Sequence, residues 1–382
     1  MYRIPYETAR RIKFCVREIL ALKKAWGAAR PEWALGGKMM PKRCGDTLLF
    51  AKAPVIGAFA AVGGKKEGEG PLAAGFDALY EDNTMGEKSW EKAESDLIED
   101  CAKRCLQKGG THAAAVSLAL MGDLQAQCTA SGYAMRALGM PFTGVYGACS
   151  TMAESLGLAA CLCAAGLCEQ ALAGASSHFC AAERQFRTPL EYGGKRTPTA
   201  QWTATAAGCA LVRPAGAGVR ISAVTFGRVQ DYGIKDINNM GAAMAPAAAA
   251  TLLRYLRDTG ESPAQYDAIL TGDLGRVGSG LLAELMEAEG VPLPNHKDCG
   301  CLLYDAAVQQ VKAGGSGAGC SAAVLCAHIL PMLEKRRWHR VLFMATGALM
   351  SQTTFLQKES IPAIAHLVAL EVPDDAKGEA AV

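Results

Sequence analysis

The chain has 382 residues, half of them hydrophobic, and a formal net charge of only +2. This length suits two domains or one domain with a duplicated core, and the near-neutral charge argues against a general affinity for nucleic acid. The fifteen cysteines mostly stand singly in apolar runs, which fits a reducing interior, and no pattern predicts a cofactor site, a metal site or a membrane-spanning segment.

Residues 1–39 are predicted to be a basic extension outside the folded body. The first 43 residues hold eleven Lys/Arg and three Asp/Glu, a net charge of 11 − 3 = +8, which leaves 2 − 8 = −6 for the rest. Residues 10–26 have the pattern of a basic amphipathic helix, which would bind a membrane surface or a partner. The interpretation that we favour is a non-native extension in front of a start at Met39 or Met40.

Residues 40–215 are predicted to form a first half in which strands and helices alternate. Hydrophobic periodicity predicts an amphipathic helix over 89–106, which is followed by a polar turn and a buried strand. The other predicted elements are a strand-like stretch at 47–62, a glycine-rich loop at 63–70, strands at 113–120, 141–146, 170–175 and 202–212, and helices at 131–138 and 150–165.

Cys149 lies where the predicted strand 141–146 gives way to the predicted helix 150–165. Gly147 and Ala148 permit a tight turn there, and the N-terminus of a helix stabilises a thiolate. The position is typical of a nucleophile, although a small buried cysteine would have the same surroundings. These residues alone leave both interpretations open.

Residues 181–198 are predicted to form a long loop beside a strand end. Cations and aromatic rings in such a loop suit an anionic aromatic ligand, but a solvated surface with Glu–cation pairs has the same composition. The residues concerned are Arg184, Phe186, Arg187, Tyr192, Lys195 and Arg196.

Residues 216–372 are predicted to form a second half, followed by a frayed acidic tail at 373–382. The predicted strands are 218–226, 268–270, 340–344 and 364–370, and the predicted helices are 245–257, 281–289 and 322–333. A glycine-rich turn at 313–321 precedes the last of these helices.

The second half repeats the first. Residues 118–124 (Leu-Ala-Leu-Met-Gly-Asp-Leu) match 268–274 (Ala-Ile-Leu-Thr-Gly-Asp-Leu), and Gly-Ala-Cys149-Ser matches Gly-Ala-Gly-Cys320-Ser. We therefore expect two similar α/β halves with helix-covered mixed sheets, and a cleft between them that receives Cys149 and both Gly-Asp-Leu strand ends. Asp123 and Asp273 are most simply explained as caps of the following helix or turn.

Two duplicated halves with a cysteine elbow in the first resemble the thiolase fold of thiolases and ketoacyl synthases. Longer motifs over about residues 41–372 resemble the stage V sporulation protein AD family. These motifs are Gly-Ala-Cys149-Ser-Thr-Met, Ser176-Ser-His-x-x-x-Ala-Glu-Arg-Gln-Phe-Arg187, Glu191-Tyr-Gly-Gly194, Met244-Ala-Pro-Ala-Ala248 and Leu270-Thr-Gly-Asp-Leu274.

This resemblance implies a spore or forespore protein, soluble or peripheral at the inner spore membrane. It implies binding of dipicolinic acid (pyridine-2,6-dicarboxylate), alone or with calcium. It further implies action together with other stage V sporulation A membrane proteins in uptake of this ligand into the developing spore. By analogy with thiolase-type proteins, the chain is also expected to be able to form a homodimer.

The catalytic partners of the family enzymes are missing. In ketoacyl synthases a His follows the strand that here ends in Thr271-Gly272-Asp273, and a His or Asn belongs to the turn that here reads Gly314-Gly315-Ser316. A carboxylate at Asp273 would oppose ionisation of a nearby thiol. The sequence therefore favours a non-catalytic binder over the alternative, an acyltransferase or condensing enzyme that uses Cys149; a purely structural subunit is a third hypothesis.

The predicted ligand site combines a helix N-terminus and cations for two carboxylates with an aromatic wall for the ring. No catalytic residue is assigned. The residues predicted to contact the ligand are Cys149, Ser150, His178, Arg184, Arg187, Tyr192, Lys195 and Asp273.

Overall fold

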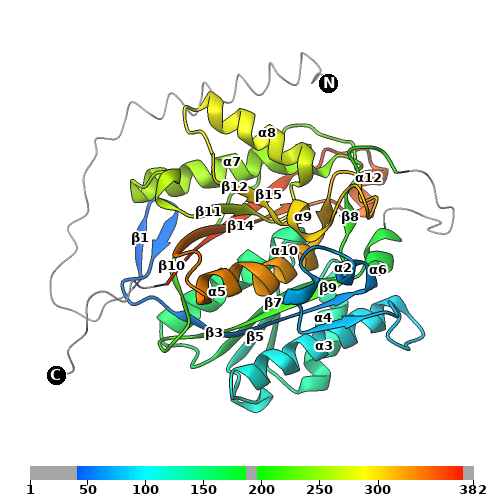
Figure 1. Cartoon of the computed structure of the whole chain (residues 1–382), viewed down its shortest axis with the longest axis vertical. Coiled ribbons are helices and arrows are strands. Elements are labelled where there is room, and N and C mark those ends of the chain that lie inside the picture. Colours follow the sequence, from blue (N-terminus) through cyan, green and yellow to red (C-terminus); the bar gives the residue numbers. More distant parts are fainter. Residues whose placement is uncertain (1–40, 186–195, 373–382) are drawn as a thin grey trace.

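The computed structural model describes residues 41–185 and 196–372 (Figure 1). The long strands are β3 (Val55–Gly64), β5 (Leu118–Gly122), β7 (Ala171–Ser177), β9 (Ala206–Arg213), β10 (Val219–Thr225), β11 (Ala268–Thr271), β14 (Arg340–Ala348) and β15 (Ala363–Glu371). The short ones are β1 (Lys42–Cys44), β2 (Thr47–Leu49), β4 (Ala78–Tyr80), β6 (Phe142–Gly144), β8 (Trp202–Thr203), β12 (His296–Asp298) and β13 (Gly315–Ser316).

The strand order contains the same arrangement twice. The main path runs β12-β11-β14-β15-β10 and continues β3-β9-β7-β5-β6. β11 pairs in parallel with β12 and β14, as β5 does with β6 and β7, while β15 and β9 are antiparallel to their neighbours. The two Gly-Asp-Leu stretches thus follow corresponding strands, β5 and β11.

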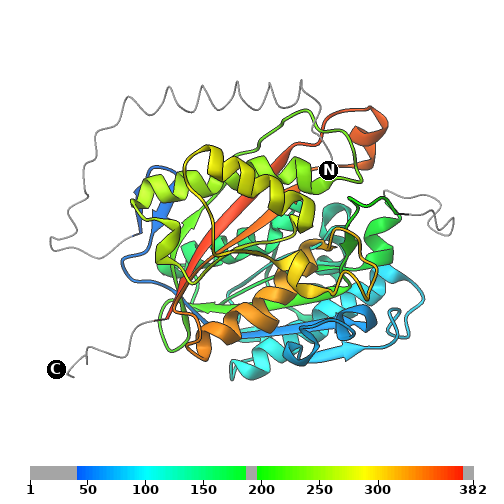
Figure 2. The same cartoon turned by 45° about the horizontal axis from the view of Figure 1, so that its top comes forward.

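Helices form three layers around these strands. The helices are α2 (Lys65–Gly68), α3 (Trp90–Lys108), α4 (Thr129–Leu138), α5 (Thr151–Ala164), α6 (Phe179–Glu183), α7 (Met240–Thr259), α8 (Gly275–Ala288), α9 (Cys299–Leu303), α10 (Ala318–Val324), α11 (Leu330–Glu334) and α12 (Gln352–Leu356). α3 and α4 cover one outer face and α7 and α8 the other, while α5 and α10 lie between the two groups of strands (Figures 1 and 2).

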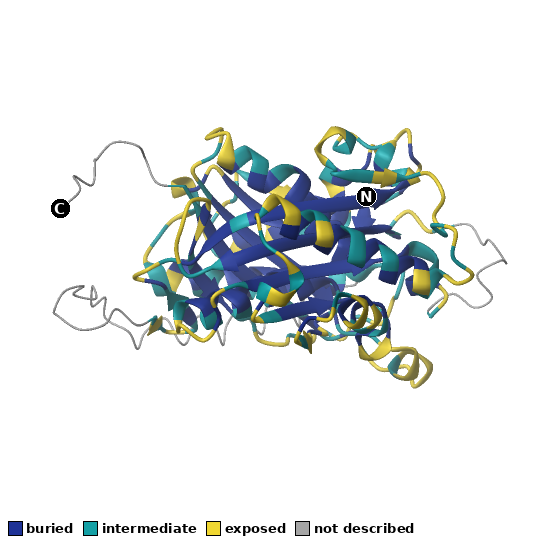
Figure 3. Ribbon diagram, turned by 90° about the horizontal axis from the view of Figure 1, so that it is seen from below, coloured by how far each residue is buried: buried dark blue, intermediate teal, exposed yellow. Residues whose placement is uncertain are grey.

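Small residues let the central helices approach both groups of strands. Met152, Leu156 and Ala160 of α5 are buried, and a Cβ on Gly157 would come within 2.9 Å of the Val224 side chain. Figure 3 shows that the central strands and helices are almost entirely buried, whereas exposed residues lie at the rim. Close packing of helices between the two groups of strands therefore requires the alanine and glycine content of the sequence.

Several predicted elements are confirmed. Ser89 caps α3 by accepting a hydrogen bond from the backbone N–H of Lys92 (3.3 Å), which is the start expected for the helix 89–106. α4, α5, β7, β10, β14 and β15 also lie where strands and helices are predicted, within a few residues.

Other predictions about local structure are wrong. The segment 141–146 is not a buried strand, because β6 has a neighbour on one side only and Thr143 and Gly144 are exposed. Residues 202–212 are not one strand, because Thr203 ends β8, which pairs with β13 in a separate two-stranded sheet, before β9 begins at Ala206. Pairing partners from distant parts of the chain decide both outcomes.

The bounds of several helices and strands also differ from those predicted. The predicted loop 63–70 contains α2, and residues Ala113–Ala115 form a 3-10 turn ahead of β5. α7 and α8 begin before residues 245 and 281, and α7 contains Pro246 inside the helix. Burial against β15 and α8 offsets the hydrogen bond that Pro246 cannot donate.

The predicted helix 10–26, the acidic tail 373–382 and three predicted site residues lie outside the described residues. The three are Arg187, Tyr192 and Lys195. Within residues 41–185 and 196–372, none of the helices combines the length and the apolar character that crossing a bilayer requires.

Candidate functional site

Cys149 lies in the 3-10 turn Ala148–Ser150, between edge strand β6 and central helix α5. The turn is tight, since Ala148 adopts a left-handed conformation with φ of +52°. Cys149 is only 6% exposed, and the pKa of its thiol is influenced by the carboxyl group of Asp273, which follows β11 in the other half. The structure therefore brings together the predicted nucleophile position and one of the two Gly-Asp-Leu strand ends.

Three donors hold the Asp273 carboxyl group. Oδ2 accepts hydrogen bonds from Ser316 Oγ and from the Gly317 N–H, both at 2.9 Å, and Oδ1 accepts one from Thr346 Oγ1 at 3.0 Å. Asp273 is completely buried. Its role is to fix the turn before α10 against β14 and, through that turn, the surroundings of Cys149.

The electrostatics of this pair keep the sulfur protonated. Burial raises the pKa of Asp273 to about 6, and the hydrogen bond from Cys149 acts in the opposite direction. Burial and then the Asp273 charge raise the pKa of the Cys149 thiol well above its usual value. Desolvation and the neighbouring carboxyl group thus act against the stabilisation of a thiolate that is predicted for the helix N-terminus.

The other described site candidates face elsewhere. Ser150 Oγ donates a hydrogen bond to the Gly147 carbonyl (2.6 Å). His178 is buried, with Nε2 2.8 Å from the Asn83 carbonyl oxygen and Nδ1 accepting from a backbone N–H at the start of α6. Arg184 forms an ion pair with Glu91 at 2.5 Å. Ser150 and His178 thus make hydrogen bonds internal to the fold, and Arg184 pairs with a side chain of α3.

Asp123, the counterpart of Asp273 in the repeat, has a different role. Its carboxyl group accepts hydrogen bonds from the backbone N–H groups of Gln125 and Ser131, both at 2.8 Å, and thereby holds the start of α4. The capping role expected for the Gly-Asp-Leu aspartates is thus confirmed for Asp123.

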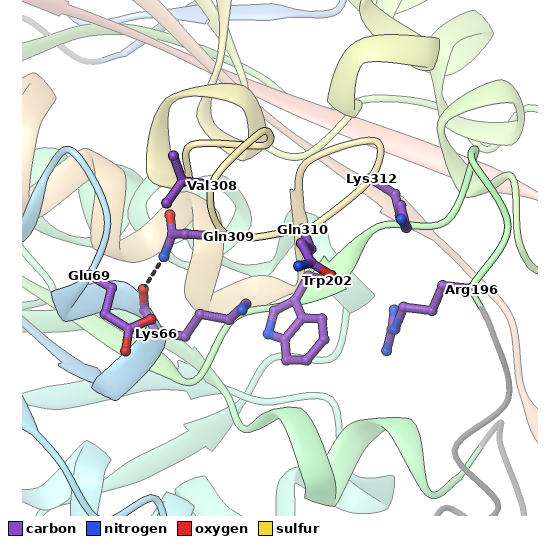
Figure 4. Close-up of a pocket in the computed structure, with 8 residues that line it drawn as sticks. All are labelled: Lys66, Glu69, Arg196, Trp202, Val308, Gln309, Gln310 and Lys312. Atoms are coloured by element: carbon purple, nitrogen blue, oxygen red, sulfur yellow. Dashed lines mark hydrogen bonds between the residues drawn. The ribbon is translucent and has the colours of Figure 1, made fainter.

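A cavity of about 710 Å³ lies between α2, β8 and the segment before β13, and β13 leads to the surroundings of Cys149 and Asp273 (Figure 4). Its walls come from both halves: α2 and β8 belong to the first, and the segment before β13 belongs to the second. The lining residues are Lys66, Glu69, Arg196, Trp202, Val308, Gln309, Gln310 and Lys312.

The indole of Trp202 lies among cations in this cavity. Phe179 packs flat against it, with ring centroids 4.1 Å apart, while Lys66 Nζ and Arg196 Cζ lie 4.5 and 4.8 Å from its centroid. Figure 4 shows Lys66 and Arg196 on opposite sides of the ring and Lys312 across the cavity. An aromatic wall with cations around it is the arrangement that a flat anion requires.

Arg196 is held by a carboxylate, whereas the two lysines are not. The Arg196 guanidinium forms an ion pair with Glu183 (3.1 Å) and donates to the Gln201 carbonyl (2.6 Å). Among the described residues, no carboxylate forms an ion pair with Lys66 or Lys312. Their charge is therefore available to an anion.

One strand pair connects the cavity with the Cys149 turn. Trp202 lies opposite Gly315 and Thr203 opposite Ser316 in the parallel pair of β8 and β13. Gln201 Nε2 also donates to the carbonyl groups of Asp273 (2.6 Å) and Gly315 (2.8 Å). Ser316 in turn donates to Asp273, so the wall of the cavity and the surroundings of Cys149 belong to one hydrogen-bonded unit.

Trp202, Lys66 and Lys312 are missed by the sequence analysis, and Arg196 is noted only as a loop cation. Lys66 is hidden in a stretch predicted as a loop, and Trp202 in a stretch predicted as one continuous strand. The sequence did contain one signal, because lysines next to glycine-rich turns can line a binding site. Gln310 and Lys312 also adopt left-handed conformations, which the sequence does not reveal.

Within the described ranges, no group of three or more His, Cys, Asp and Glu side chains is arranged to hold a metal ion.

Sequence comparison decides the family. The family model for Stage V sporulation protein AD (SpoVAD) matches residues 44–371. The chain is also 42% identical over 327 residues to stage V sporulation protein AD of Bacillus subtilis (strain 168), covering 85% of this chain and 96% of that protein. This chain belongs to the stage V sporulation protein AD family. The predicted family is confirmed, and with it a role in sporulation.

Solved structures confirm the thiolase-like fold. The 3-oxoacyl-[acyl-carrier-protein] synthase III of Aquifex aeolicus VF5 matches with a TM-score of 0.52 at 11% identity, over 84% of this chain and 100% of that one. Cerulenin-bound OleA of Xanthomonas matches with a TM-score of 0.55 at 14% identity, over 87% and 100%. At such low identity these matches establish the fold alone.

Proposed function

We propose that this member of the stage V sporulation protein AD family binds pyridine-2,6-dicarboxylate without converting it, in the cavity beside Trp202. The observation that carries the proposal is the indole between Lys66 and Arg196 with Lys312 across from it. The ligand ring would lie against the indole, and its two carboxylates would reach the cations around it.

The proposal moves the ligand from Cys149 to the neighbouring cavity. Cys149 and Asp273 are buried, and the Asp273 carboxyl group is already held by Ser316, Gly317 and Thr346, so neither residue offers a free group to a dianion. A buried carboxylate would also repel the ligand. Lys66 and Lys312 offer positive charge, and Arg196 is already oriented by Glu183.

A non-catalytic role is supported by the same pair. Acyl transfer through Cys149 needs a thiolate and a donor for the developing oxyanion. Here the nearest titratable partner is a carboxyl group that raises the pKa of the thiol. The family name supports a role in spore formation, and we propose that the bound ligand passes to the membrane proteins of the stage V sporulation A group.

Calorimetric titration of dipicolinate into the full-length protein tests the site. We expect saturable binding that is at least tenfold weaker in Lys66→Gln and Lys312→Gln, because each removes a cation from the cavity. Lys65→Gln is the matched control, since Lys65 is adjacent in sequence and instead pairs with Glu81 (3.3 Å). Absence of binding to the wild type, or equal weakening in the control, would refute the site.

Two further arms separate the alternatives. Cys149→Ala is expected to bind dipicolinate like the wild type; a loss there with unaffected lysine variants would return the ligand to Cys149. Mass spectrometry after incubation with acyl-CoA tests catalysis. A stable acyl group on Cys149 would contradict the non-catalytic assignment and favour the acyltransferase.

A further inference from the structure

A second cavity, of about 280 Å³, lies between the 3-10 turn Ala73–Gly75 and the π-helical turn Leu325–Ile329. The two turns approach closely, because a Cβ on Gly75 would come within 2.2 Å of the Ala327 carbonyl oxygen. Pro331 cannot donate the helical hydrogen bond that this carbonyl would otherwise receive, which accounts for the widened turn. The cavity is thus built into the helix that continues α10.

The lining of this cavity is amphipathic. Leu72, Pro331 and Met332 contribute apolar surface, and Lys335 and Arg337 place two cations at the rim. Both cations are exposed, and neither forms an ion pair with a described carboxylate. The run 334–339 (Glu-Lys-Arg-Arg-Trp-His) contains three Lys/Arg and a single Glu, so the local sequence is basic as well.

We propose that this cavity binds the headgroup of an anionic phospholipid and so docks the protein on an anionic membrane surface. The phosphate lies between Lys335 and Arg337, and the adjoining apolar part of the lipid lies against Leu72 and Met332. A zwitterionic lipid also has a phosphate, but its own cationic group offsets that charge and its surface has no net charge to attract Lys335 and Arg337; a free inorganic anion would leave the apolar lining unused. Only an anionic amphiphile uses the whole lining.

The second cavity lies near the Trp202 cavity. The short segment 66–75 separates the two cavities: Lys66 and Glu69 line the first, and Leu72 and Gly75 line the second. A membrane held at the second cavity would therefore lie close to the Trp202 cavity. The docking is argued from different residues than the dipicolinate site, so either can fail without the other.

Flotation of the full-length protein with vesicles tests the docking. Vesicles of phosphatidylcholine are compared with vesicles that also contain phosphatidylglycerol. We expect binding to the second kind only, and a partition coefficient about 30-fold lower for the double variant Lys335→Gln, Arg337→Gln, as two basic residues at ~1 kcal/mol each predict. Any vesicle binding by residues 1–39 is common to all variants and cancels in this comparison.

The matched control removes two exposed cations elsewhere, Lys88→Gln with Arg136→Gln, and is expected to bind like the wild type. Ala74→Gln places a polar side chain at the rim without changing the charge, and it should also weaken binding. Thermal melting verifies that each variant is folded. Equal loss in the double variant and the control, retained binding in the double variant, or equal binding of wild type to both kinds of vesicle would overturn the proposal.

Discussion

Asp273 accepts hydrogen bonds from Ser316, Gly317 and Thr346 while it lies against the thiol of Cys149. A carboxyl group in this place does the opposite of what an imidazolium would do, because its negative charge disfavours the thiolate. Burial and the neighbouring carboxyl group therefore act together against ionisation of Cys149.

Substitution of Asp273 tests this dependence. In Asp273→Asn the charge is removed while one acceptor oxygen remains, so the pKa of the Cys149 thiol should fall. At a pH below the thiol pKa, alkylation speeds up roughly tenfold for each pKa unit lost. Peptide-resolved labelling with iodoacetamide at pH 8 measures the rate, and Asp123→Asn is the control. An unchanged rate at Cys149 would show that burial alone protects the sulfur.

At the scale of elements, backbone contact between the halves positions the Cys149 turn. Gly347 of β14 lies so close to this turn that an added Cβ would come within 2.4 Å of the Gly147 carbonyl oxygen. By contrast, a Cβ on Gly280 of α8 would meet no atom within 4 Å. The same substitution at these two glycines should therefore have opposite effects.

Gly347→Ala is expected to lower the free energy of unfolding by about 1–3 kcal/mol, because backbone must move to admit the methyl group. Gly280→Ala should raise it by about 0.5–1 kcal/mol, since alanine favours an exposed helix position. Urea unfolding of both variants measures the difference. If Gly347→Ala proved as stable as the wild type, the close approach of β14 to the turn would be wrong.

Elements were predictable wherever local pattern and tertiary packing agree. α3 has both a cap at Ser89 and an apolar face, and it was predicted almost residue by residue. β8 and β13 have two residues each and exist only because distant segments pair, so no local pattern marks them. The Trp202 cavity depends on this pair, which is why its residues were missed while Cys149 and Asp273 were found.

At the scale of the whole molecule, buried acids make stability depend on pH. Glu94 of α3 is buried and accepts hydrogen bonds from Gln125 Nε2 (2.7 Å) and Ser176 Oγ (2.8 Å). Burial, and then the charge of Asp123, raise its pKa to about 8. Because the folded-state pKa lies above that of the unfolded chain, the stability that this group contributes is complete at low pH and is lost as the pH rises to about 8.

Glu94→Gln should remove this part of the pH dependence. Between about pH 5 and 8 the folded wild type holds one proton more than the unfolded chain at this position, which lowers its stability by up to ~1.4 kcal/mol per pH unit. The variant should therefore gain relative to the wild type across this range. Urea unfolding from pH 5 to 8 measures the free energy of unfolding of both proteins, with Glu287→Gln, at an exposed position, as the control. If the free energies of Glu94→Gln and the wild type changed in parallel with pH, the raised pKa of Glu94 would be contradicted.

The sequence by itself determined the duplicated α/β plan, the position of the Cys149 turn and the absence of the histidine and asparagine partners. These features depend on periodic apolar residues and on motifs that are continuous in the chain. Only the tertiary structure decided that Cys149 and Asp273 are both buried, that His178 contacts Asn83 and Arg184 pairs with Glu91, and that Lys66, Trp202 and Lys312 share a cavity. Desolvation and convergence depend on residues that are distant in the sequence, and no local pattern encodes them.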